Sequence, residues 1–401
     1  MLKSFKLHNF KTFLNCEVQL SRRHLLIGKN SSGKTNFASA LQFLAGTCDT
    51  TLDQAASFIP GGVAEISNWG TTSEEVELSC TCELDFEGEP CEFVYQLNLL
   101  QSSPTFSDTE RPGLRVRKER LSVTCAGFDN VVLLENDGRE ALLTHERQVT
   151  ESESPHRPRT LAPKNATMLS KLFELETNRR AILFRNYLGG WCYFSLSPYA
   201  MRHGPAPATP TAVVLGSLGH ELSDVVFHLK NRDERRYRRL IEHARIVEPA
   251  LEAINFYVSP DQRPLPAVEL SGKSQASWTG LSDGALRTLA LAYIIERASA
   301  LSPPEWPTSS LTVIEEPENG LFPGQLRQIF DLFEEWAPTA QFIFTSHSPY
   351  FIDMFDNKRD CVTIFRKTGD RSEASSPKEA GNGQAEERFS LSTEYASDLF
   401  S

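Results

Sequence analysis

The sequence predicts an α/β protein with a mixed or parallel sheet at its core, an antiparallel β subdomain and a helical insertion. Three observations carry this prediction. A glycine-rich turn joins an apolar strand to a helix at residues 24–37, and strand-like runs follow one another between residues 76 and 134. Two later apolar strands, 311–314 and 341–345, each end in polar residues, as is typical of the carboxyl edge of a parallel sheet.

Length and composition bound the class of protein. The chain of 401 residues is long enough for one large or two ordinary domains. Its net charge of −11 disfavours a wholly basic nucleic-acid coat but leaves room for a local basic patch. The eight cysteines include no C-x-x-C pair, so we expect reduced thiols rather than metal ligands. We see no signal peptide, and the longest apolar stretch, around residues 286–295, is too short to span a bilayer. We therefore expect a cytoplasmic protein with no membrane partner.

The segment from Gly28 to Thr35 matches the phosphate-loop pattern G-x-x-x-x-G-K-[ST]. Backbone N–H groups of such a turn cradle phosphate oxygens, and Gly33 allows the backbone to approach them closely. Lys34 is expected to reach the β and γ phosphates, and the Thr35 hydroxyl to bind Mg²⁺. The dipole of the following helix contributes only about 0.3–2 kcal/mol, so the loop must bind through many contacts together. The residues predicted to bind nucleotide here are Gly28, Lys29, Asn30, Ser31, Ser32, Gly33, Lys34, Thr35 and Asn36.

The first 150 residues alternate between strand and turn patterns. Residues 2–10 and 13–20 predict two antiparallel strands, and residues 34–44 a helix with one apolar face. Residues 47–72 look irregular; Gln54 lies there and either contacts Mg²⁺ or the attacking water or is simply exposed. Runs bounded by turn residues then predict an antiparallel β subdomain, with strands at 76–86, 91–100, 114–125 and 131–134.

The middle and the end of the chain give weaker patterns. We expect an exposed loop at 150–164, helices at 165–188 and 221–254, and a proline-rich link at 204–210. Residues 367–388 are rich in Ser, Glu, Gly and Lys, which predicts a low-complexity tail. The predicted division is an N-terminal lobe, a helical insertion, a C-terminal lobe and the tail, at residues 1–150, 151–270, 271–366 and 367–401.

One predicted helix carries a run of cations. Two interpretations stay open. The run is either a solvated face with Asp233 and Glu234 interleaved, or a patch that follows the phosphates of DNA or RNA. The cations are Lys230, Arg232, Arg235, Arg236, Arg238 and Arg239.

Three later motifs complete the pattern. Leu281-Ser282-Asp283-Gly284 stands directly before a predicted helix, which Ser282 can cap and whose first N–H groups can face an anion. The strand 311–314 ends in Glu315 and Glu316, and the strand 341–345 ends in Ser-His-Ser-Pro, with His347 as its histidine. Parallel strands bring such ends to one edge of the sheet, where phosphate sites form.

Taken in this order, the four motifs resemble those of the ATP-binding-cassette (ABC) ATPases. The closer likeness is to the branch with SMC, RecF and OLD heads, and within it to the stand-alone bacterial ATPases of the AAA15/AAA21 type. The motifs that match are Asn-Phe-Lys at residues 9–11, the phosphate loop, Leu-Ser-Asp-Gly, Ile-Glu-Glu-Pro-Glu-Asn-Gly-Leu and Thr-Ser-His-Ser-Pro. The likeness covers residues 1–366, and the middle of that range matches only in outline.

The resemblance implies a role for each motif, with ATP and Mg²⁺ as cofactors. Thr35 and Glu315 would hold Mg²⁺, Glu316 would polarise the attacking water, and His347 would sense the γ-phosphate. In phosphoryl transfer the protein mainly positions groups and stabilises charge. Because cassette dimers sandwich two ATP molecules, the resemblance also places two residues on the nucleotide of the other protomer, namely Ser282 and Gly284.

Three departures from the family pattern are visible. Glu315 stands where transporters usually have Asp, Phe322 stands where many relatives have His, and Ala285 replaces the usual Thr. The first makes the geometry of the metal site less certain, and the second removes any role of that histidine.

The resemblance implies an ATPase that dimerises or oligomerises with ATP and gates or drives a separately encoded effector, in bacterial phage defence or DNA maintenance. The alternatives are an ATP-gated scaffold without hydrolysis, which turnover would distinguish, an OLD-like nuclease and a transporter motor. About fifty residues follow His347 without the Glu and Asp-x-Asp set of such a nuclease. The N-terminal Asn-Phe-Lys and the missing Gly-Gly-Gln disfavour the transporter motor.

Overall fold

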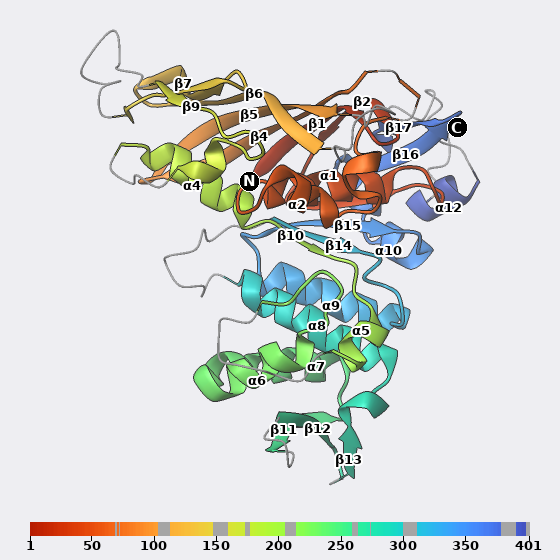
Figure 1. Ribbon diagram of the computed structural model, residues 1–401. Helices are drawn as coiled ribbons and strands as arrows, with labels where there is room; N and C mark the ends of the chain where they lie inside the picture. The colour runs from red at the N-terminus through yellow and green to blue at the C-terminus, as the bar shows by residue number, and fades with distance from the viewer. Residues whose placement is uncertain are drawn as a thin grey trace, which may run out of the picture.

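The protein is built from stacked layers of sheets and helices (Figure 1). An eight-stranded antiparallel sheet, a six-stranded mixed sheet and a small three-stranded sheet are separated by helical layers. No helix within the described residues is long and apolar enough to cross a membrane. The computed structural model describes residues 1–68, 70–71, 73–102, 113–146, 159–172, 177–204, 214–258, 264–272, 274–299, 311–377 and 390–397.

The antiparallel sheet has the strand order β2-β1-β4-β5-β6-β7-β8-β9. The six strands predicted at 2–10, 13–20, 76–86, 91–100, 114–125 and 131–134 are all confirmed in this sheet. Strand β9 lies within the predicted loop at 150–164, of which 150–158 fall outside the described residues. Inward-facing residues of the strands share a core with helices α1 (Lys34–Gly46), α2 (Leu52–Ser57) and α4 (Arg179–Gly189). The strands are β1 Leu2–Phe10, β2 Phe13–Gln19, β4 Glu75–Phe86, β5 Glu89–Ser102, β6 Gly113–Cys125, β7 Phe128–Asn136, β8 Glu140–Leu143 and β9 Arg159–Leu161.

The mixed sheet confirms the predicted core and carries the site. Its order is β10-β14-β15-β3-β16-β17, with the first five strands parallel and β17 antiparallel to β16. Every residue of β3 and β15 is buried, as expected for strands covered on both faces. The strands are β3 Arg23–Ile27, β10 Cys192–Phe194, β14 Leu311–Glu315, β15 Gln341–Ser346, β16 Val362–Thr368 and β17 Arg371–Ser375.

Helix α1 (Lys34–Gly46) lies between the two large sheets (Figure 1). The ring of its Phe37 lies 5.5 Å from that of Phe5 on β1 and 5.4 Å from that of Phe365 on β16, measured between centroids. This helix therefore joins both sheets into one core. The opposite face of the mixed sheet is covered by α8 and α9, below which lie α6, α7 and the small sheet (Figure 1). Their bounds are α6 Leu222–Arg232, α7 Glu234–Val247, α8 Asp283–Ala298, α9 Pro323–Trp336, β11 Leu251–Val258, β12 Pro264–Leu270 and β13 Ser274–Ser277.

Two predicted helices are shorter than expected. Between 165 and 188 the structure has a 3₁₀ turn, Leu169–Lys171, and α4, Arg179–Gly189, while 173–176 lie outside the described residues. The backbone N–H groups of Met168 and Leu169 donate to the buried carboxylate of Glu119 at 2.6 and 2.8 Å. This anchor holds the turn against the antiparallel sheet, and α4 begins only later.

The predicted helix at 221–254 is two helices followed by a strand. Asp233 ends α6 and caps α7, where its side chain accepts from the N–H of Arg236 at 3.1 Å. Helix α7 ends at Val247, two residues before Pro249, which cannot continue it. The residues from Leu251 then form β11.

Residues 47–72 are not wholly irregular. Helix α2 (Leu52–Ser57) begins with a capping box, in which Thr51 and Gln54 satisfy each other's backbone N–H groups. The Gln54 side chain is engaged there and does not line the phosphate-loop pocket. This favours the interpretation that Gln54 is simply exposed over contact with Mg²⁺ or the attacking water. A short 3₁₀ turn, Gly62–Glu65, follows.

The predicted tail contains regular structure. Strand β16 continues to Thr368, β17 lies wholly within the tail, and α12 (Leu391–Ala396) packs on α10 (Pro349–Asp353). The N–H of Ser372 on β17 donates to the carbonyl of Thr12 at 2.8 Å, so the hairpin is tied to the start of the chain. Residues 378–389 of the predicted tail and 205–210 of the predicted link lie outside the described residues. The four-part division of the chain stays a prediction.

Candidate functional site

The predicted phosphate loop lies between β3 and α1. Gly33 precedes α1, and within the described ranges no side chain caps the first N–H groups of that helix, so these groups can bind an anion. A Cβ on Gly28 would come within 2.4 Å of the carbonyl oxygen of Phe365, and one on Gly33 within 2.6 Å of the hydroxyl oxygen of Ser372. The two glycines are therefore required by the β16–β17 hairpin that packs against the loop.

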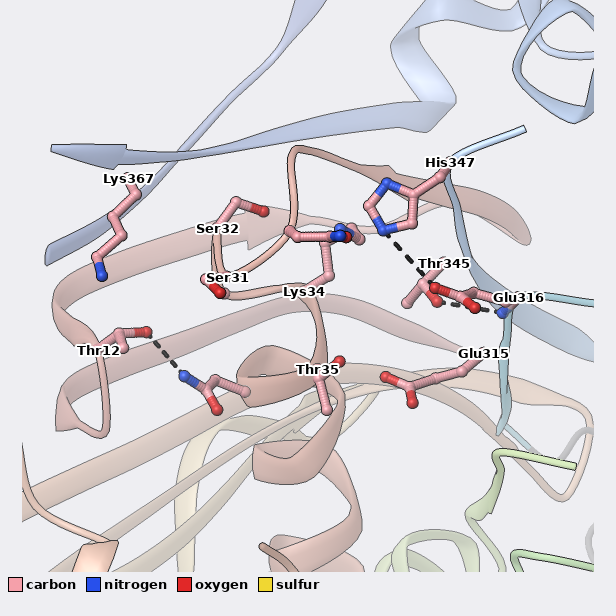
Figure 2. A pocket seen from close by; sticks show the side chains of 13 residues that line it. Thr12, Ser31, Ser32, Lys34, Thr35, Glu315, Glu316, Thr345, His347 and Lys367 are labelled. Atoms are coloured by element: carbon pink, nitrogen blue, oxygen red, sulfur yellow. Dashed lines mark hydrogen bonds and ion pairs between the residues drawn. The ribbon is translucent and has the colours of Figure 1, made fainter. Parts of the chain in front are cut away.

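A pocket of about 420 Å³ opens over this loop. It brings together residues from the loop, the ends of β14 and β15, the β1–β2 turn and β16, which surround it in Figure 2. Of the predicted loop residues, Gly28 and Lys29 do not line it, and Lys29 lines a second, more open hollow beside it. The lining residues are Thr12, Asn30, Ser31, Ser32, Gly33, Lys34, Thr35, Asn36, Glu315, Glu316, Thr345, His347 and Lys367.

Lys34 is almost fully buried at the centre of the pocket. Its ammonium donates to the carbonyl oxygens of Gly28 and Lys29, at 2.6 and 3.2 Å. Burial lowers the pKa of Lys34 to about 8, against the opposing effect of the nearby carboxylates, chiefly Glu316. The ammonium is thus held by two uncharged acceptors, in a site where an added anion would raise its pKa.

Thr35 and Glu315 lie across the pocket from each other, with the carboxylate pointing toward the threonine (Figure 2). One carboxylate oxygen of Glu315, Oε2, accepts from the hydroxyl of Tyr193 at 2.8 Å. The other, Oε1, is buried and has no hydrogen-bond partner among the residues that the structure describes. A hydroxyl and an unpaired carboxylate oxygen are the hard donors that Mg²⁺ prefers, so these two residues fit the metal that the resemblance implies.

Glu316 and His347 form the other side of the pocket. The backbone of Glu316 has φ = 45°, a left-handed conformation that costs energy for a non-glycine residue and is concentrated at functional sites. The side-chain amide of Asn319 donates to Glu316 Oε2 at 2.6 Å, and His347 Nε2 lies 3.6 Å from Oε1 (Figure 2). Burial and the charge of Lys34 lower the pKa of His347, so its imidazole is neutral at pH 7.

Several residues of this region were not singled out from the sequence, among them Glu318, Thr12 and Lys367. Glu318 accepts hydrogen bonds from the Ser346 hydroxyl and from the backbone N–H groups of His347 and Ser348, which fixes the turn that carries the histidine. The sequence feature that could have pointed to Glu318 is its place as the third acid after the predicted strand 311–314. Thr12 and Lys367 line the pocket on the side away from His347 (Figure 2). Thr12 directly follows the Asn-Phe-Lys motif, whereas Lys367 fell in the predicted tail.

The Asn-Phe-Lys motif itself is structural here. Asn9 and Lys11 are buried and both have positive φ, at 55° and 48°. The Asn9 amide donates to the carbonyls of Ser73 and Glu75, and the Lys11 ammonium donates to the carbonyl of Pro60. These bonds hold the β1–β2 turn and so place Thr12 at the pocket.

Ser282 and Gly284 lie at the start of α8 and do not line the pocket. Ser282 Oγ accepts from the N–H of Ala285 at 3.1 Å, which confirms the predicted cap and leaves its hydroxyl proton free to donate. A Cβ on Gly284 would come within 2.7 Å of the carbonyl oxygen of Gly320. Arg202 braces the same turn, with bonds of 2.8 Å to the carbonyl of Leu281 and 2.7 Å to Asp283.

Half of the predicted basic run is used inside the protein. Arg236 and Arg239 both contact the carboxylate of Glu296, whose side chain is 1% exposed. Lys230 donates to the carbonyl of Ile254 and the side chain of Asn255 at 2.7 and 2.8 Å. The solvated-face interpretation therefore needs correction for these three residues, because they bind buried or half-buried acceptors. Nucleic-acid binding through residues 230–239 stays an untested prediction.

Two family models match the chain, one on each side of its middle. Residues 1–167 match a family described as "AAA ATPase domain". Residues 207–353 match a family described as "AAA domain, putative AbiEii toxin, Type IV TA system". No curated protein matches the chain.

Among solved structures, the chain is similar to SMC heads. A crystal structure of an SMC head bound to the C-winged helix domain of ScpA aligns with a TM-score of 0.54 at 12% identity, covering 94% of this chain and 99% of that one. The SMC head domain from Thermotoga maritima aligns with a TM-score of 0.42 at 12% identity, over 94% and 98% of the two chains. An SMC head from Pyrococcus furiosus, bound to the C-terminal domain of ScpA, aligns with a TM-score of 0.48 at 12% identity, over 94% and 97%.

Proposed function

We propose that the chain is a P-loop ATPase of the ABC type, because AAA-domain family models match residues 1–167 and 207–353 and its fold is that of an SMC head. It binds ATP with Mg²⁺, closes with a second copy around the nucleotide, and hydrolyses the γ-phosphate bond to gate or drive a separately encoded effector. One observation carries the proposal. A single pocket is lined by residues from three distant segments of the sequence, namely Lys34 and Thr35, Glu315 and Glu316, and His347.

The first step is capture of the phosphates. The uncapped N–H groups of α1 and the ammonium of Lys34 face the same pocket, so both can bind the β and γ phosphates. Thr35 and Glu315 would hold Mg²⁺, which when bound neutralises charge on the phosphate oxygens. Several weak contacts act together, as the small contribution of a single helix dipole requires.

The second step is activation of water. Asn319 occupies one oxygen of the Glu316 carboxylate, which leaves Oε1 to accept a proton from a water placed beside it. General-base assistance of this kind contributes about 10²–10⁴-fold to a rate. The neutral His347, 3.6 Å from Oε1, can hydrogen-bond the same water or a γ-phosphate oxygen.

The site in one chain is open on this side, which supports closure by a second copy. The side chains of Glu316 and His347 remain 41% and 32% exposed. They also line the more open hollow, together with Lys29, Asn30 and Asn319. Ser282 and Gly284 lie outside both hollows. A two-fold arrangement would bring the Ser282 turn of one copy, with its free hydroxyl proton, against the nucleotide of the other.

The proposed biological setting rests on the comparisons with known proteins and not on the geometry of the site. The description of one matched family names a toxin system, and an SMC head similar to this chain is bound to a ScpA domain. We infer a cytoplasmic switch for a protein effector in phage defence or DNA maintenance. The alternative is a scaffold gated by ATP binding alone, which would need Lys34 and Thr35 but not Glu316.

The test is the Glu316→Gln variant, since Gln keeps the shape of the side chain and loses its charge. We expect ATP hydrolysis to fall about 10²–10⁴-fold, while nucleotide binding is retained because Lys34, Thr35 and Glu315 are unchanged. Light scattering with Mg²⁺-ATP should show a larger species, because a ligand that binds only the closed state shifts the population toward it.

The matched control adds Ser282→Arg, which places a bulky cation in the turn that would meet the second nucleotide. The larger species should then be lost. An unchanged mass in the parent and both variants, with ATP shown to be bound, would exclude the shared site. Absence of hydrolysis in the parent under conditions where the larger species forms would favour the scaffold.

A further inference from the structure

We propose that Tyr193 positions the carboxylate of Glu315 for metal binding. The inference rests on the proposed function, because it deepens the assignment of Thr35 and Glu315 to the Mg²⁺ site. Tyr193 lies on β10, more than a hundred residues from β14 in sequence.

The sheet register places the tyrosine correctly. Strand β10 is parallel to β14, with Tyr193 paired to Val313. Paired residues project from the same face, and so does the residue two positions further along a strand. Tyr193 and Glu315 therefore share the face that α1 covers, and the long phenol reaches along the strand to the carboxylate. Thr35 is in the first turn of that same helix.

The hydrogen bond gives the two carboxylate oxygens of Glu315 different surroundings. Oε2 accepts from the phenol at 2.8 Å, and Oε1 is left buried, with no partner in the described part of the chain. A carboxylate oxygen can only accept, so the phenol of Tyr193 is the donor of this bond.

A glutamate needs this support more than an aspartate does. It has one more rotatable bond, so holding its carboxylate in one place costs more rotamer entropy. Tyr193 is half-buried, and its ring packs against the core that α1 shares with the antiparallel sheet. This packing restricts the movement of the phenol. Groups that orient a metal ligand typically change metal affinity by about 10–100-fold when they are removed.

The experiment titrates Mg²⁺ into the full chain with a fluorescent ATP analogue, starting from EDTA. For Tyr193→Phe we expect the Mg²⁺ midpoint to rise about 10–100-fold, with unchanged analogue affinity in EDTA, because the phosphate loop is intact. The matched control is Tyr95→Phe. It deletes an equivalent buried phenol, one that donates to Glu119 at 3.0 Å in the antiparallel sheet, and should leave the midpoint unchanged.

A double variant separates positioning from a general structural effect. In Glu315→Asp the carboxylate is withdrawn by one methylene and no longer reaches the phenol. Adding Tyr193→Phe to that background should then change the Mg²⁺ midpoint no further, since the coupling between the two sites is already lost. A similar shift in both backgrounds would overturn the proposal.

The titration distinguishes a wrong role for Tyr193 from a wrong proposed function. If Tyr193→Phe keeps the midpoint of the parent while the parent shows Mg²⁺-dependent binding, only the role of Tyr193 is wrong. If the parent binds no nucleotide analogue with or without Mg²⁺, the proposed function is wrong and the role of Tyr193 falls with it.

Discussion

If Lys34 binds the phosphates as proposed, its ionisation should make nucleotide binding depend on pH in a range where most side chains do not titrate. Burial lowers the pKa of this ammonium to about 8 before any ligand binds. Phosphate oxygens placed beside it favour the charged form and raise the pKa in the complex. Because the bound state has the higher pKa, binding takes up a proton, and affinity is lost as the pH rises through the pKa of the free site.

The size of the effect follows from the free-site value. With a pKa of about 8, roughly 90% of the protein carries the charged ammonium at pH 7 and roughly 10% at pH 9. The dissociation constant should therefore rise about tenfold between these two pH values, which corresponds to about 1.4 kcal/mol. The terminal phosphate of a nucleotide loses its last proton with a pKa of about 6, so the charge of the nucleotide is nearly constant between pH 7 and pH 9.

The assay is isothermal titration calorimetry with Mg²⁺-ATP at pH 7, 8 and 9, in two buffers of different ionisation enthalpy at each pH. Proton uptake should approach one per nucleotide at pH 9 and nearly vanish at pH 7. The control is Lys34→Arg, because a guanidinium stays charged throughout this range. It should bind more weakly but with little pH dependence. A parent dissociation constant that is the same at pH 7 and pH 9, with no proton uptake, would refute the assignment of Lys34 to the phosphates.

Two further predictions concern the charges around the site and in the helical layer. Glu296→Ala should lower the free energy of unfolding by about 3–5 kcal/mol, because it leaves the largely buried Arg236 and Arg239 without their common carboxylate. In urea denaturation Glu234→Ala, which breaks a well-exposed pair with Arg238, should change that free energy by less than about 1 kcal/mol, and equal losses would contradict the account. Lys367→Ala should weaken ATP binding by about 1 kcal/mol at low salt and by less at high salt, since this exposed cation lines the pocket. Arg371→Ala, on the same hairpin but outside the pocket lining, is its control, and a loss of equal size there would remove the role of Lys367.

Much of the site could be predicted because its chemistry lies in short contiguous motifs. The loop from Gly28 to Thr35 carries its spacing within one strand–turn–helix unit, and the acids after β14 and the histidine after β15 follow buried apolar strands. In a parallel sheet such strand ends meet at one edge. The pocket that contains Lys34, Glu316 and His347 follows from that rule.

Other parts of the fold were wrong or missing because local composition competes with tertiary contacts. Residues 367–388 look like a tail, yet β17 forms because it pairs with β16 and binds Thr12 from the other end of the chain. The basic run looks like a solvated face, yet two of its arginines reach a buried Glu296 on α8, almost sixty residues away. Neither partner can be read from the neighbouring sequence.

The sequence by itself determined which residues we propose for phosphate and metal binding, since residue type and spacing within a motif set the chemistry that is available. Only the tertiary structure decided how those groups are held. The pairing of β10 with β14 brings Tyr193 to Glu315, and the packing of the β16–β17 hairpin requires Gly28 and Gly33 and adds Lys367 to the pocket. The physical reason is that strand order and register join segments distant in the chain, and no local pattern encodes which strand becomes a neighbour.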